Sequence, residues 1–423
     1  MLKRTTAFLY IGALFWLLSS VYSQPRGKDS CVECHQKMDG ELQEPAKKIT
    51  NDIHYLRGLS CYNCHGGDPS SDDMEVAMDP KKGYIGKPKP TDIPQLCGKC
   101  HSNADFMRDY NPSLRVDQLN EYGTSRHGKL LARGDTKVAV CSSCHGAHGI
   151  RKASDPQSSV YPKNVVNTCT KCHANPQYMR GHNIPTNQKM KYMDSVHSKA
   201  LFGKGDLSAP TCNSCHGNHG ASPPGLSSIA AICGQCHASQ YEYFIASPHK
   251  KAFKQGGLPE CATCHDNHGI KSPSDSMLGT QTESLCINCH SQGDKGFNAA
   301  NKMRDRIELL KARLEQSEIV LNRAERAGME VSREKFDLIE GKNKLIKARV
   351  LIHAFNPNEI EKITNEGLAI SVSTQKAGER AMGDLQFRRK GLAVSLIIIF
   401  LVVITLYMKI RQIERVASRP DEA

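Results

Sequence analysis

The sequence predicts a mainly α-helical protein with much irregular structure, followed by a C-terminal helical hairpin or bundle and one transmembrane helix. Three observations support this fold class. A five-residue cysteine motif recurs nine times between Cys31 and His290. A helical period of apolar residues replaces it from Asn298 onward, and residues 391–408 then carry no charge. We expect the domains 1–23, 24–293, 294–388, 389–410 and 411–423.

The recurring motif is C-x-x-C-H. Two thiols at this spacing can form thioethers with the two vinyl groups of one haem, and the adjacent histidine can bind the iron as an axial ligand. Structural zinc needs four ligands and gives no reason for a histidine after every second cysteine. Disulfides do not impose a fixed spacing. All eighteen cysteines fall in the motifs, so we predict nine covalently bound haem c groups.

The motif residues make up the predicted haem attachment sites. The thioether cysteines are Cys31, Cys34, Cys61, Cys64, Cys97, Cys100, Cys141, Cys144, Cys169, Cys172, Cys212, Cys215, Cys233, Cys236, Cys261, Cys264, Cys286 and Cys289. The motif histidines, which we expect to be proximal iron ligands, are His35, His65, His101, His145, His173, His216, His237, His265 and His290.

The composition leaves little material for an ordinary hydrophobic core. The chain has one tryptophan, 6% aromatic residues and a mean hydropathy of −0.48. Residues 24–290 provide roughly 30 residues per haem, and a segment of that size buries too little surface to be stable alone. We therefore expect the porphyrins to form the core, with short helices carrying the motifs and a fold that depends on haem.

The formal net charge of +13 does not indicate nucleic-acid binding. Each haem has two propionates, so it contributes about −1 when ferric and about −2 when ferrous, and the charge of a cofactor has to be counted. Nine haems bring the total to roughly +4 when oxidised and roughly −5 when reduced. The basic residues are expected to pair with propionates, and no nucleic-acid partner is predicted.

Residues 1–23 read as a secretory signal. Lys3 and Arg4 precede an apolar stretch, and small residues precede Gln24. The alternative is an uncleaved anchor, although the apolar stretch is short for a full membrane span. In both cases the following residues are exported, which suits haem attachment outside the cytoplasm.

The haem region contains an internal repeat. Its unit is Ser-x-His, a spacer that contains glycine, a first motif extended to C-x-x-C-H-G-x-H-G, and a second, plainer motif. We number the copies repeats 1 to 4. Repeat 1 is degenerate, with Asp68 in place of the later histidine, and the motif at Cys31 stands alone. The repeats consist of His54, Cys61 and Cys97; His127, Cys141 and Cys169; His197, Cys212 and Cys233; and His249, Cys261 and Cys286.

The nine remaining histidines recur at fixed places in these copies, which makes them candidates for the second axial position. His148 follows His145 by only three residues, so it cannot reach the opposite face of the same iron. We expect it to bind a neighbouring haem. His353 is placed at the end of a returning helix, near the last haems; the alternative is an ordinary helix-end histidine. The candidates are His54, His127, His148, His182, His197, His219, His249, His268 and His353.

The section from 294 to 388 is predicted to be helical. Met303, Ile307, Leu310, Leu314 and Leu321 recur at helical spacing, and a second helix after Gly328 carries Phe336, Ile339, Leu345, Ile346, Val350 and Ile352. Asn356, Pro357 and Glu359 indicate the start of a third helix. The segment 389–410 is long enough to span a bilayer core. Basic residues flank it on both sides, so the exported haems orient it, and the tail 411–423 is expected in the cytoplasm.

The motifs CHGAHG, CHGNHG and CHDNHG resemble those of multihaem c-type cytochromes with doubled C-x-x-C-H motifs, the relatives of hydroxylamine oxidoreductase, pentahaem nitrite reductase and octahaem tetrathionate reductase. The resemblance covers about residues 31–290. It implies haems in stacked and perpendicular pairs that conduct electrons. It does not imply catalysis, because the nitrite reductases mark their catalytic haem with C-x-x-C-K and this sequence has no such motif.

Two functions remain open. The first is an electron-transfer protein of anaerobic respiration, anchored in the bacterial inner membrane with its haems in the periplasm. It passes electrons between a quinone-linked membrane complex and periplasmic cytochromes or outer-membrane acceptors. The second is a reductase or oxidoreductase of a small nitrogen or sulfur compound, which needs one open iron site. Cys31, whose surroundings fit the repeat least, is the candidate for that site.

Overall fold

The computed structural model describes residues 28–417, so the predicted signal segment 1–23 and the end of the predicted tail, 418–423, lie outside the described residues. The described residues form helices and irregular connections, without a β-strand. The predicted fold class, mainly α with much irregular structure, is confirmed. Two compact units are present. The first contains the residues up to Gly225 together with Asn267–Lys271, and the second contains Leu226–Asp266 and the residues from Ser272 onward.

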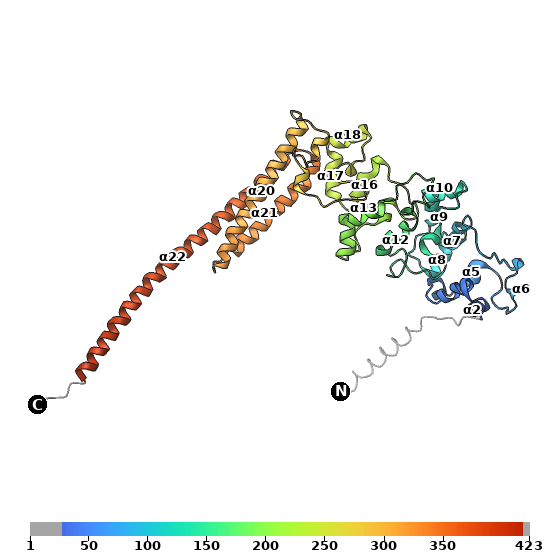
Figure 1. Cartoon of the computed structure of the whole chain (residues 1–423), viewed down its shortest axis with the longest axis horizontal. Coiled ribbons are helices and arrows are strands. Elements are labelled where there is room, and N and C mark those ends of the chain that lie inside the picture. Colours follow the sequence, from blue (N-terminus) through green and yellow to red (C-terminus); the bar gives the residue numbers. More distant parts are fainter. Residues whose placement is uncertain (1–27, 418–423) are drawn as a thin grey trace, which may run out of the picture. The chain divides into compact units, whose positions relative to one another are not determined.

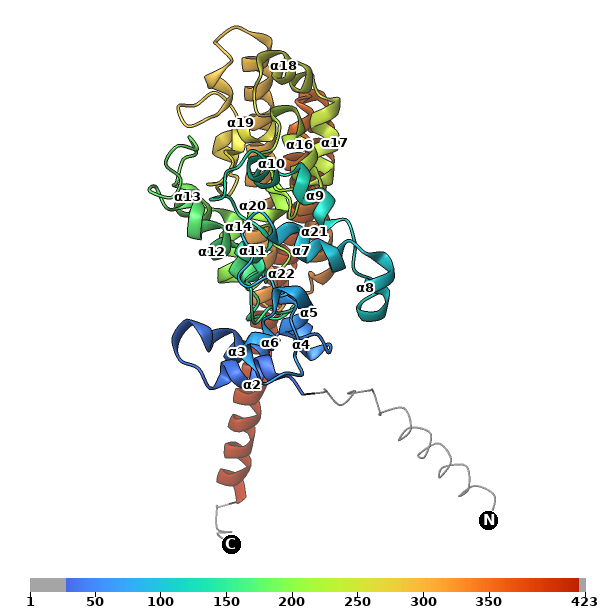
Figure 2. The same ribbon diagram turned by 90° about the vertical axis from the view of Figure 1, so that its right-hand side faces the viewer.

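The first unit consists of short helices. They are α2 (Ser30–Gln36), α3 (Glu44–Ile49), α4 (Ile53–Leu56), α5 (Cys61–His65), α6 (Met74–Ala77), α7 (Ile93–His101), α8 (Ala104–Tyr110), α9 (Gln118–Thr124), α10 (Arg126–Ala132), α11 (Cys141–His145), α12 (Pro162–His173), α13 (Gln188–Asp194), α14 (Val196–Ser198) and α15 (Cys212–His216), with the π-helical turn η3 (Lys199–Gly203) and the 3₁₀ turns η1 (Gly40–Leu42) and η2 (Pro80–Lys82). Helix α2 contacts α3 and α5, and Figure 2 shows these three close together.

Motif position decides helix length in this unit. Each first motif forms a helix of five residues, as in α5, α11 and α15. The second motifs lie at the ends of the longer helices α7 and α12. Buried apolar side chains are few and scattered, with Val166 and Leu201 the most enclosed. This pattern agrees with the expectation that the polypeptide alone does not supply a continuous core.

The second unit combines short helices with a bundle of three long ones. The short elements are η4 (Leu226–Ser228), α16 (Ile229–Gly234), α17 (Ala238–Ala246), α18 (Pro248–Gly256), α19 (Cys261–His265), η5 (Asp275–Met277) and η6 (Cys286–Asn288). The bundle is made of α20 (Lys295–Arg326), α21 (Ser332–Leu351) and the first part of α22 (Pro357–Ala417), with η7 (Ile352–Ala354) before α22. Figure 1 shows the three long helices side by side.

The bundle has an ordinary hydrophobic core. All five predicted apolar positions of the first long helix are buried in it. Small residues let the helices approach closely: a Cβ atom on Gly341 would lie 2.7 Å from Leu314 Cδ2, and one on Gly367 would lie 2.8 Å from Leu310 Cδ1. The interior therefore has no room for an added methyl group at these points without repacking.

The buried face of α21 differs from the apolar positions picked out in the sequence. Leu338, Leu345, Ala348 and Leu351 are buried, whereas Phe336, Ile339 and Ile346 are exposed. The difference arises because apolar residues occur on more than one face of this helix. Gly341 has no side chain, so neighbouring helices can approach α21 closely there. The face of α21 that contains Gly341 is therefore the buried one.

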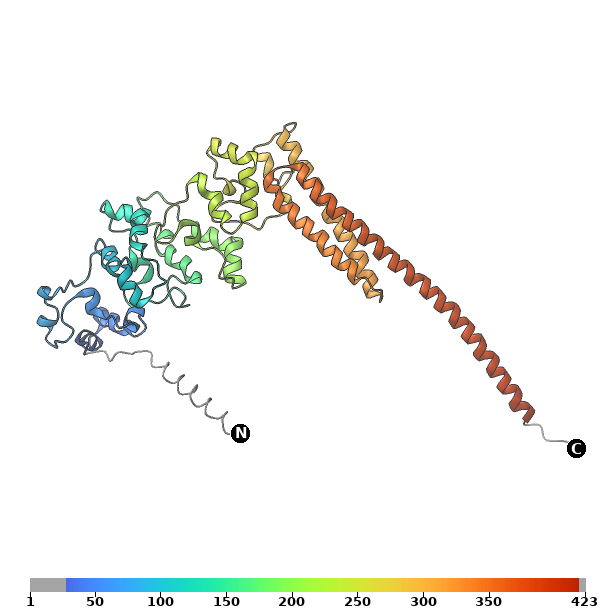
Figure 3. The same ribbon diagram turned by 180° about the vertical axis from the view of Figure 1, so that it is seen from behind.

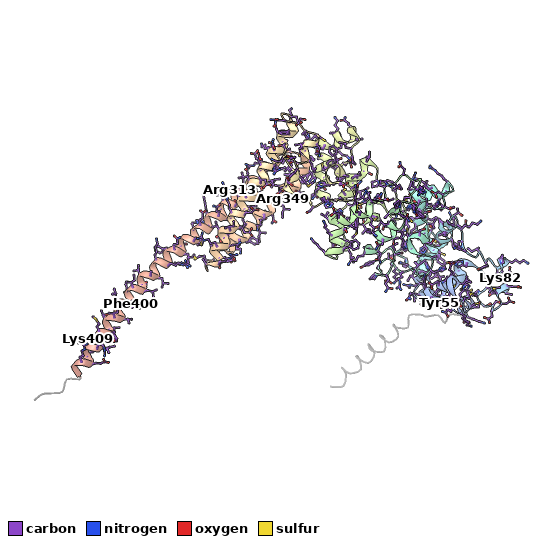
Figure 4. The ribbon with its side chains drawn as sticks, viewed as in Figure 1. Tyr55, Lys82, Arg313, Arg349, Phe400 and Lys409 are labelled. Atoms are coloured by element: carbon purple, nitrogen blue, oxygen red, sulfur yellow. The ribbon has the colours of Figure 1, made fainter. Side chains whose placement is uncertain are left out.

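Helix α22 begins at Pro357, as predicted, and the Asn356 side chain accepts a hydrogen bond from the Asn358 amide at 3.1 Å. It continues without a break for 61 residues, about 90 Å at 1.5 Å per residue. Figure 3 shows it running along α20 and α21 and then extending beyond them. Its apolar segment is fully exposed, with mean hydropathy 2.7, and is long enough to cross a membrane. Phe400 and Lys409 lie on this extension (Figure 4).

The last two motif segments pack against the bundle inside the second unit. Leu278 belongs to the bundle core, and Tyr243 and Cys286 pack against that core. Arg349 of α21 donates to both carboxylate oxygens of Asp275, at 2.8 and 2.6 Å. Phe355 packs with Phe244 and Phe253 in a smaller cluster. These contacts bring the C-terminal end of α21 next to the segments that carry the motifs at Cys261 and Cys286.

Replacing Ile307 by alanine tests the bundle core. Ile307 is fully buried, so Ile307→Ala should lower the free energy of unfolding of the bundle by about 2–5 kcal/mol. Ile319 on the same helix is 68% exposed, and Ile319→Ala should change the free energy of unfolding by less than about 0.5 kcal/mol. Far-ultraviolet circular dichroism of the haem-loaded chain during denaturant titration measures both. Equal effects at the two positions would contradict this packing.

Candidate functional site

The first motifs are shaped by local hydrogen bonds. In α11 and α15 the residue before the second cysteine of the motif caps the short helix. Ser143 Oγ accepts from the Val140 amide and Ser214 Oγ from the Thr211 amide, both at 3.0 Å. Gly146 and Gly217 follow the motif histidines with φ of +84°, a conformation that glycine adopts without strain. The chain therefore makes one helical turn, presents two thiols and an imidazole, and turns away.

The serine of Ser-x-His fixes the helix that carries the second histidine. Ser125 Oγ accepts from the Gly128 amide at 2.8 Å and donates to Tyr122 O at 2.6 Å. Ser195 makes the equivalent bonds with the Ser198 amide and Tyr192 O. Both serines are buried. In repeat 1 Asp52 takes this place and binds both the amide and Nδ1 of His54. The serine is thus an N-cap, a role that the sequence pattern alone did not reveal.

Successive repeats are joined by a recurring backbone bond within the first unit. In repeats 1 to 3 the amide of the residue before the repeat's first histidine donates to a carbonyl that follows the first motif of the next repeat. The three bonds run from Ile53 to Ile150 (2.7 Å), from Arg126 to Ala221 (2.9 Å) and from Val196 to Ile270 (2.9 Å). Each bond holds the loop of one repeat against the preceding one.

At least seven pairs of facing imidazole rings occur among the described residues, and each of these seven joins one motif histidine to one non-motif histidine. The ring centroids are 5.8–6.2 Å apart in all seven. Second motifs pair inside their own repeat, in His54–His101, His127–His173 and His249–His290. First motifs pair with the following repeat, in His65–His148, His145–His219 and His216–His268.

His353 faces the motif histidine of repeat 4's first motif, as a histidine of the following repeat does in repeats 1 to 3. Its ring lies 6.1 Å from that of His265, and its Nδ1 is 2.9 Å from Val350 O. No fifth repeat follows in the sequence to supply a histidine, and the end of α21 supplies one instead. The three pairs between repeats support the prediction that a histidine of one repeat binds the haem of its neighbour. The pair of His353 with His265 supports the prediction that His353 is an iron ligand. Both remain predictions.

The spacing of the rings fits haem iron. Metal–nitrogen bonds of about 2.0–2.1 Å, with roughly 1.1 Å from each nitrogen to its ring centre, require centroids about 6 Å apart. Several Nδ1 atoms are already hydrogen-bonded to backbone carbonyls, as in His35 to Leu42 O (2.9 Å) and His65 to Gly86 O (2.8 Å). This leaves Nε2 for the metal, the usual arrangement of ligating histidines. The residues present therefore fit haem with two histidine ligands.

The paired rings fall into two classes by the angle between their planes. The pairs at first motifs are nearly parallel, with angles of 20°, 11°, 10° and 22°. The pairs at second motifs are strongly inclined, with angles of 77°, 54° and 77°. The two classes alternate along the sequence. At second motifs the facing histidine comes from the same repeat, whereas at first motifs it comes from the following repeat or, for His265, from the turn after α21.

Burial favours the neutral form of the imidazoles, which is the form that binds iron. It lowers the pKa of nine of them below the usual 6.5, and neighbouring imidazoles contribute in several cases; the nine are His101, His127, His145, His148, His173, His219, His249, His265 and His353. At neutral pH these side chains need not lose a proton before they bind a metal.

Cysteines of consecutive motifs lie next to each other. Hydrogen bonds join the thiols of Cys97 and Cys141, of Cys169 and Cys212, and of Cys233 and Cys261, and each raises the pKa of the first member of its pair. Burial is the main cause that raises the pKa of Cys61, Cys64, Cys144 and Cys264. Neighbouring negative charges raise it further: Asp29 and then Cys31 act on Cys61, Cys100 acts on Cys64, Cys141 and then Cys172 act on Cys144, and Cys286 acts on Cys264. In the haem-loaded protein these sulfurs are thioethers. The attachment points of consecutive haems are therefore close together.

The remaining predicted ligands are His35, His182, His197 and His237. Within residues 28–417, His35 has no histidine ring opposite it. His182 Nε2 lies 3.8 Å from Asp135 Oδ2, and among the described residues it faces no motif histidine at the spacing of the seven pairs. His197 and His237 both make contacts in the structure. The ligand roles of these four stay predictions.

Two features of the site were not found from the sequence. Glu260, directly before Cys261, is buried with φ of +40°, accepts from the Ala230 amide at 2.7 Å and pairs with Lys250. Nothing in the pattern of the repeats marked it. Tyr122 and Tyr192 donate to Ala139 O and Pro210 O, both at 2.9 Å. Their fixed place three residues before Ser-x-His is a signal that could have identified them.

Comparisons with known proteins agree with this site. The model of the doubled CXXCH motif matches residues 205–242 and 250–295, and that of cytochrome c554 and c-prime matches residues 19–66. The multiheme cytochrome MtrA of Shewanella baltica is 29% identical over 288 residues, which cover 65% of this chain and 69% of MtrA. The C-type polyheme cytochrome OmcC of Geobacter sulfurreducens is 23% identical over 168 residues, which cover 35% of this chain and 20% of OmcC. No solved structure matches the chain.

The two matches to the doubled motif coincide with repeats 3 and 4, and the match to cytochrome c554 and c-prime contains the motifs at Cys31 and Cys61. The predicted family resemblance is confirmed at this level. The chain is a multihaem c-type cytochrome and binds haem c covalently through its C-x-x-C-H motifs.

The ring planes predict two classes of low-spin ferric haem. Parallel imidazoles split the iron d orbitals of π symmetry, whereas crossed imidazoles leave them nearly degenerate. Low-temperature electron paramagnetic resonance of the oxidised protein should therefore show at least four haems with rhombic spectra and at least two, from the pairs at 77°, with a single large g value. One spectral class for all the haems would contradict these ring orientations.

Replacing His353 tests its assignment. In His353→Ala one haem should change from low-spin to high-spin, because the iron at Cys261 would lose its second ligand. In His353→Met the haem should return to low-spin with a raised reduction potential, since methionine ligation raises the potential relative to histidine. Magnetic circular dichroism and redox titration measure both. An unchanged spin state in His353→Ala would show that His353 is an ordinary helix-end residue.

Proposed function

We propose that this chain is a membrane-anchored nonahaem cytochrome that passes electrons along its haems in sequence order. The observation that carries the proposal is the set of seven histidine pairs, each spaced for an iron between two imidazoles. An iron with two histidine ligands has no open position for a substrate, so its chemistry is electron exchange.

The neighbouring cysteines support transfer from one haem to the next. Within the first unit they link the motifs at Cys31, Cys61, Cys97, Cys141, Cys169 and Cys212 in sequence order. Within the second unit they link those at Cys233, Cys261 and Cys286. The relatives MtrA and OmcC are named as multiheme and polyheme cytochromes, which agrees with this role.

The apolar extension of α22 supports an anchor. We assign residues 389–410 to the membrane span and 411–423 to a cytoplasmic tail, with residues 24–293 as the haem region and 294–388 as the helical section. Thioether attachment of haem outside the cytoplasm places the haems in the periplasm, and residues 1–23 would then direct export. A cytochrome held at the inner membrane is suited to exchange electrons between a quinone-linked membrane complex and periplasmic cytochromes or outer-membrane acceptors.

The test uses the full chain extracted with detergent from alkaline-washed membranes. The chain should remain in the membranes during the wash, and pyridine haemochrome analysis against protein mass should give nine haems per chain. A reductive titration should then take up nine electrons, one for each haem. A soluble electron acceptor should then reoxidise all nine haems.

Three outcomes would contradict the proposal. They are fewer than nine haems in the fully matured protein, a group of haems that does not exchange electrons with the rest, or release of the chain by the alkaline wash. The alternative function, a reductase or oxidoreductase of a small nitrogen or sulfur compound, gains support if the same preparation turns over nitrite, hydroxylamine or tetrathionate.

A further inference from the structure

We infer that the iron held by His35 has no second histidine ligand and is the position at which this cytochrome binds a small exogenous ligand. The inference rests on the proposed nonahaem function, because it concerns one of the nine haems. The ligands are those that haem iron takes at an open position: neutral π-acceptors such as carbon monoxide or nitric oxide when ferrous, and small anions such as cyanide or nitrite when ferric.

The first argument is the surroundings of His35. Its Nδ1 is held by Leu42 O at 2.9 Å, so Nε2 is directed to the iron, as in the paired motif histidines. No imidazole among residues 28–417 lies opposite this ring at the 6 Å spacing of the seven pairs. His182, the candidate without a place in the repeat, lies beside Asp135 instead.

The second argument is the place of Cys31 in the repeat. Where the leading cysteines of two motifs are neighbours, as in Cys97 with Cys141 and Cys169 with Cys212, the earlier one belongs to a second motif and the later one to a first motif. Helix α2, which carries Cys31, contacts helix α5, which carries Cys61, the leading cysteine of a first motif. The motif at Cys31 therefore takes the position of a second motif.

This position determines where a second histidine would have to come from. Each second motif with a resolved pair receives its histidine from the Ser-x-His segment upstream in the same repeat, as in His54–His101 and His249–His290. The printed sequence contains no histidine before His35. Among the described residues, no segment of the kind that supplies His54 or His249 precedes Cys31.

Met38 is the nearest alternative ligand in the sequence, and its connection is too short. It follows His35 by three residues, and its amide donates to His35 O at 3.4 Å, so the backbone is still on the proximal side of the haem. The same geometry prevents His148 from reaching the iron of His145, and there the structure places His148 opposite His65 instead. The distal face of the haem at Cys31 is thus left without a side-chain ligand from its own motif segment.

The experiment measures carbon monoxide binding to the dithionite-reduced, haem-loaded full chain. One equivalent should bind per nine haems, and the oxidised protein should show one high-spin haem by magnetic circular dichroism. The variant Cys31→Ala/Cys34→Ala removes this haem and should abolish binding. Its matched control, Cys286→Ala/Cys289→Ala, also carries eight haems and should still bind one equivalent. The magnetic circular dichroism result stands on the wild-type protein if a variant does not mature.

Several results would overturn the inference. They are nine low-spin haems that bind no carbon monoxide, binding that persists in Cys31→Ala/Cys34→Ala, and a near-infrared band of methionine-ligated ferric haem that disappears in Met38→Ala. A new high-spin haem in His182→Ala would also do so, because it would make His182 a ligand. Nine haems that take up nine electrons without binding carbon monoxide would overturn only this inference, whereas fewer than nine haems would overturn the proposed function.

Discussion

The fold depends on pairs of imidazoles held about 6 Å apart across the position of an iron. At least seven such pairs occur among the described residues, and few large side chains of the first unit are fully buried. With so little apolar packing, the free energy that orders this unit has to come largely from haem binding and metal coordination, as in other small metal-dependent domains. The buried serine caps and the tyrosine hydroxyl bonds serve this purpose, because they set the direction of the histidine-bearing helices.

Contacts between repeats make each repeat depend on its neighbour. The bond from Arg126 to Ala221 and the facing rings of His145 and His219 are two parts of one contact, and the same contact recurs on either side. Such an array needs a different residue where the series ends, as repeat proteins need capping units. For repeat 4 the histidine that faces His265 is His353, which lies in the turn η7 after α21 and not in a further motif. The motif at Cys31 lies at the other end of the series, and among the described residues no histidine ring faces its His35 in this way.

The second unit is stabilised differently. Three long helices bury Ile307, Leu310 and Ile360 completely, and glycines let them pack closely. This core does not need haem, yet the segments with the motifs at Cys261 and Cys286 pack onto it through Leu278, Tyr243 and the pair of Arg349 with Asp275. A rigid support therefore holds the last haems, and the same helix α22 that completes the support carries the apolar segment.

The sequence by itself determined the chemistry and the helical class. Thioether formation requires cysteines two residues apart, so the motifs identify haem without any tertiary information. The helical period marked α20, and the cap at Asn356 marked the start of α22, because both signals are local. Tertiary structure decided which histidines face each other, the two classes of ring angle, the buried face of α21, and the positions of His353, His182 and Glu260. These depend on contacts between residues far apart in the chain, such as His65 and His148, which local spacing cannot specify.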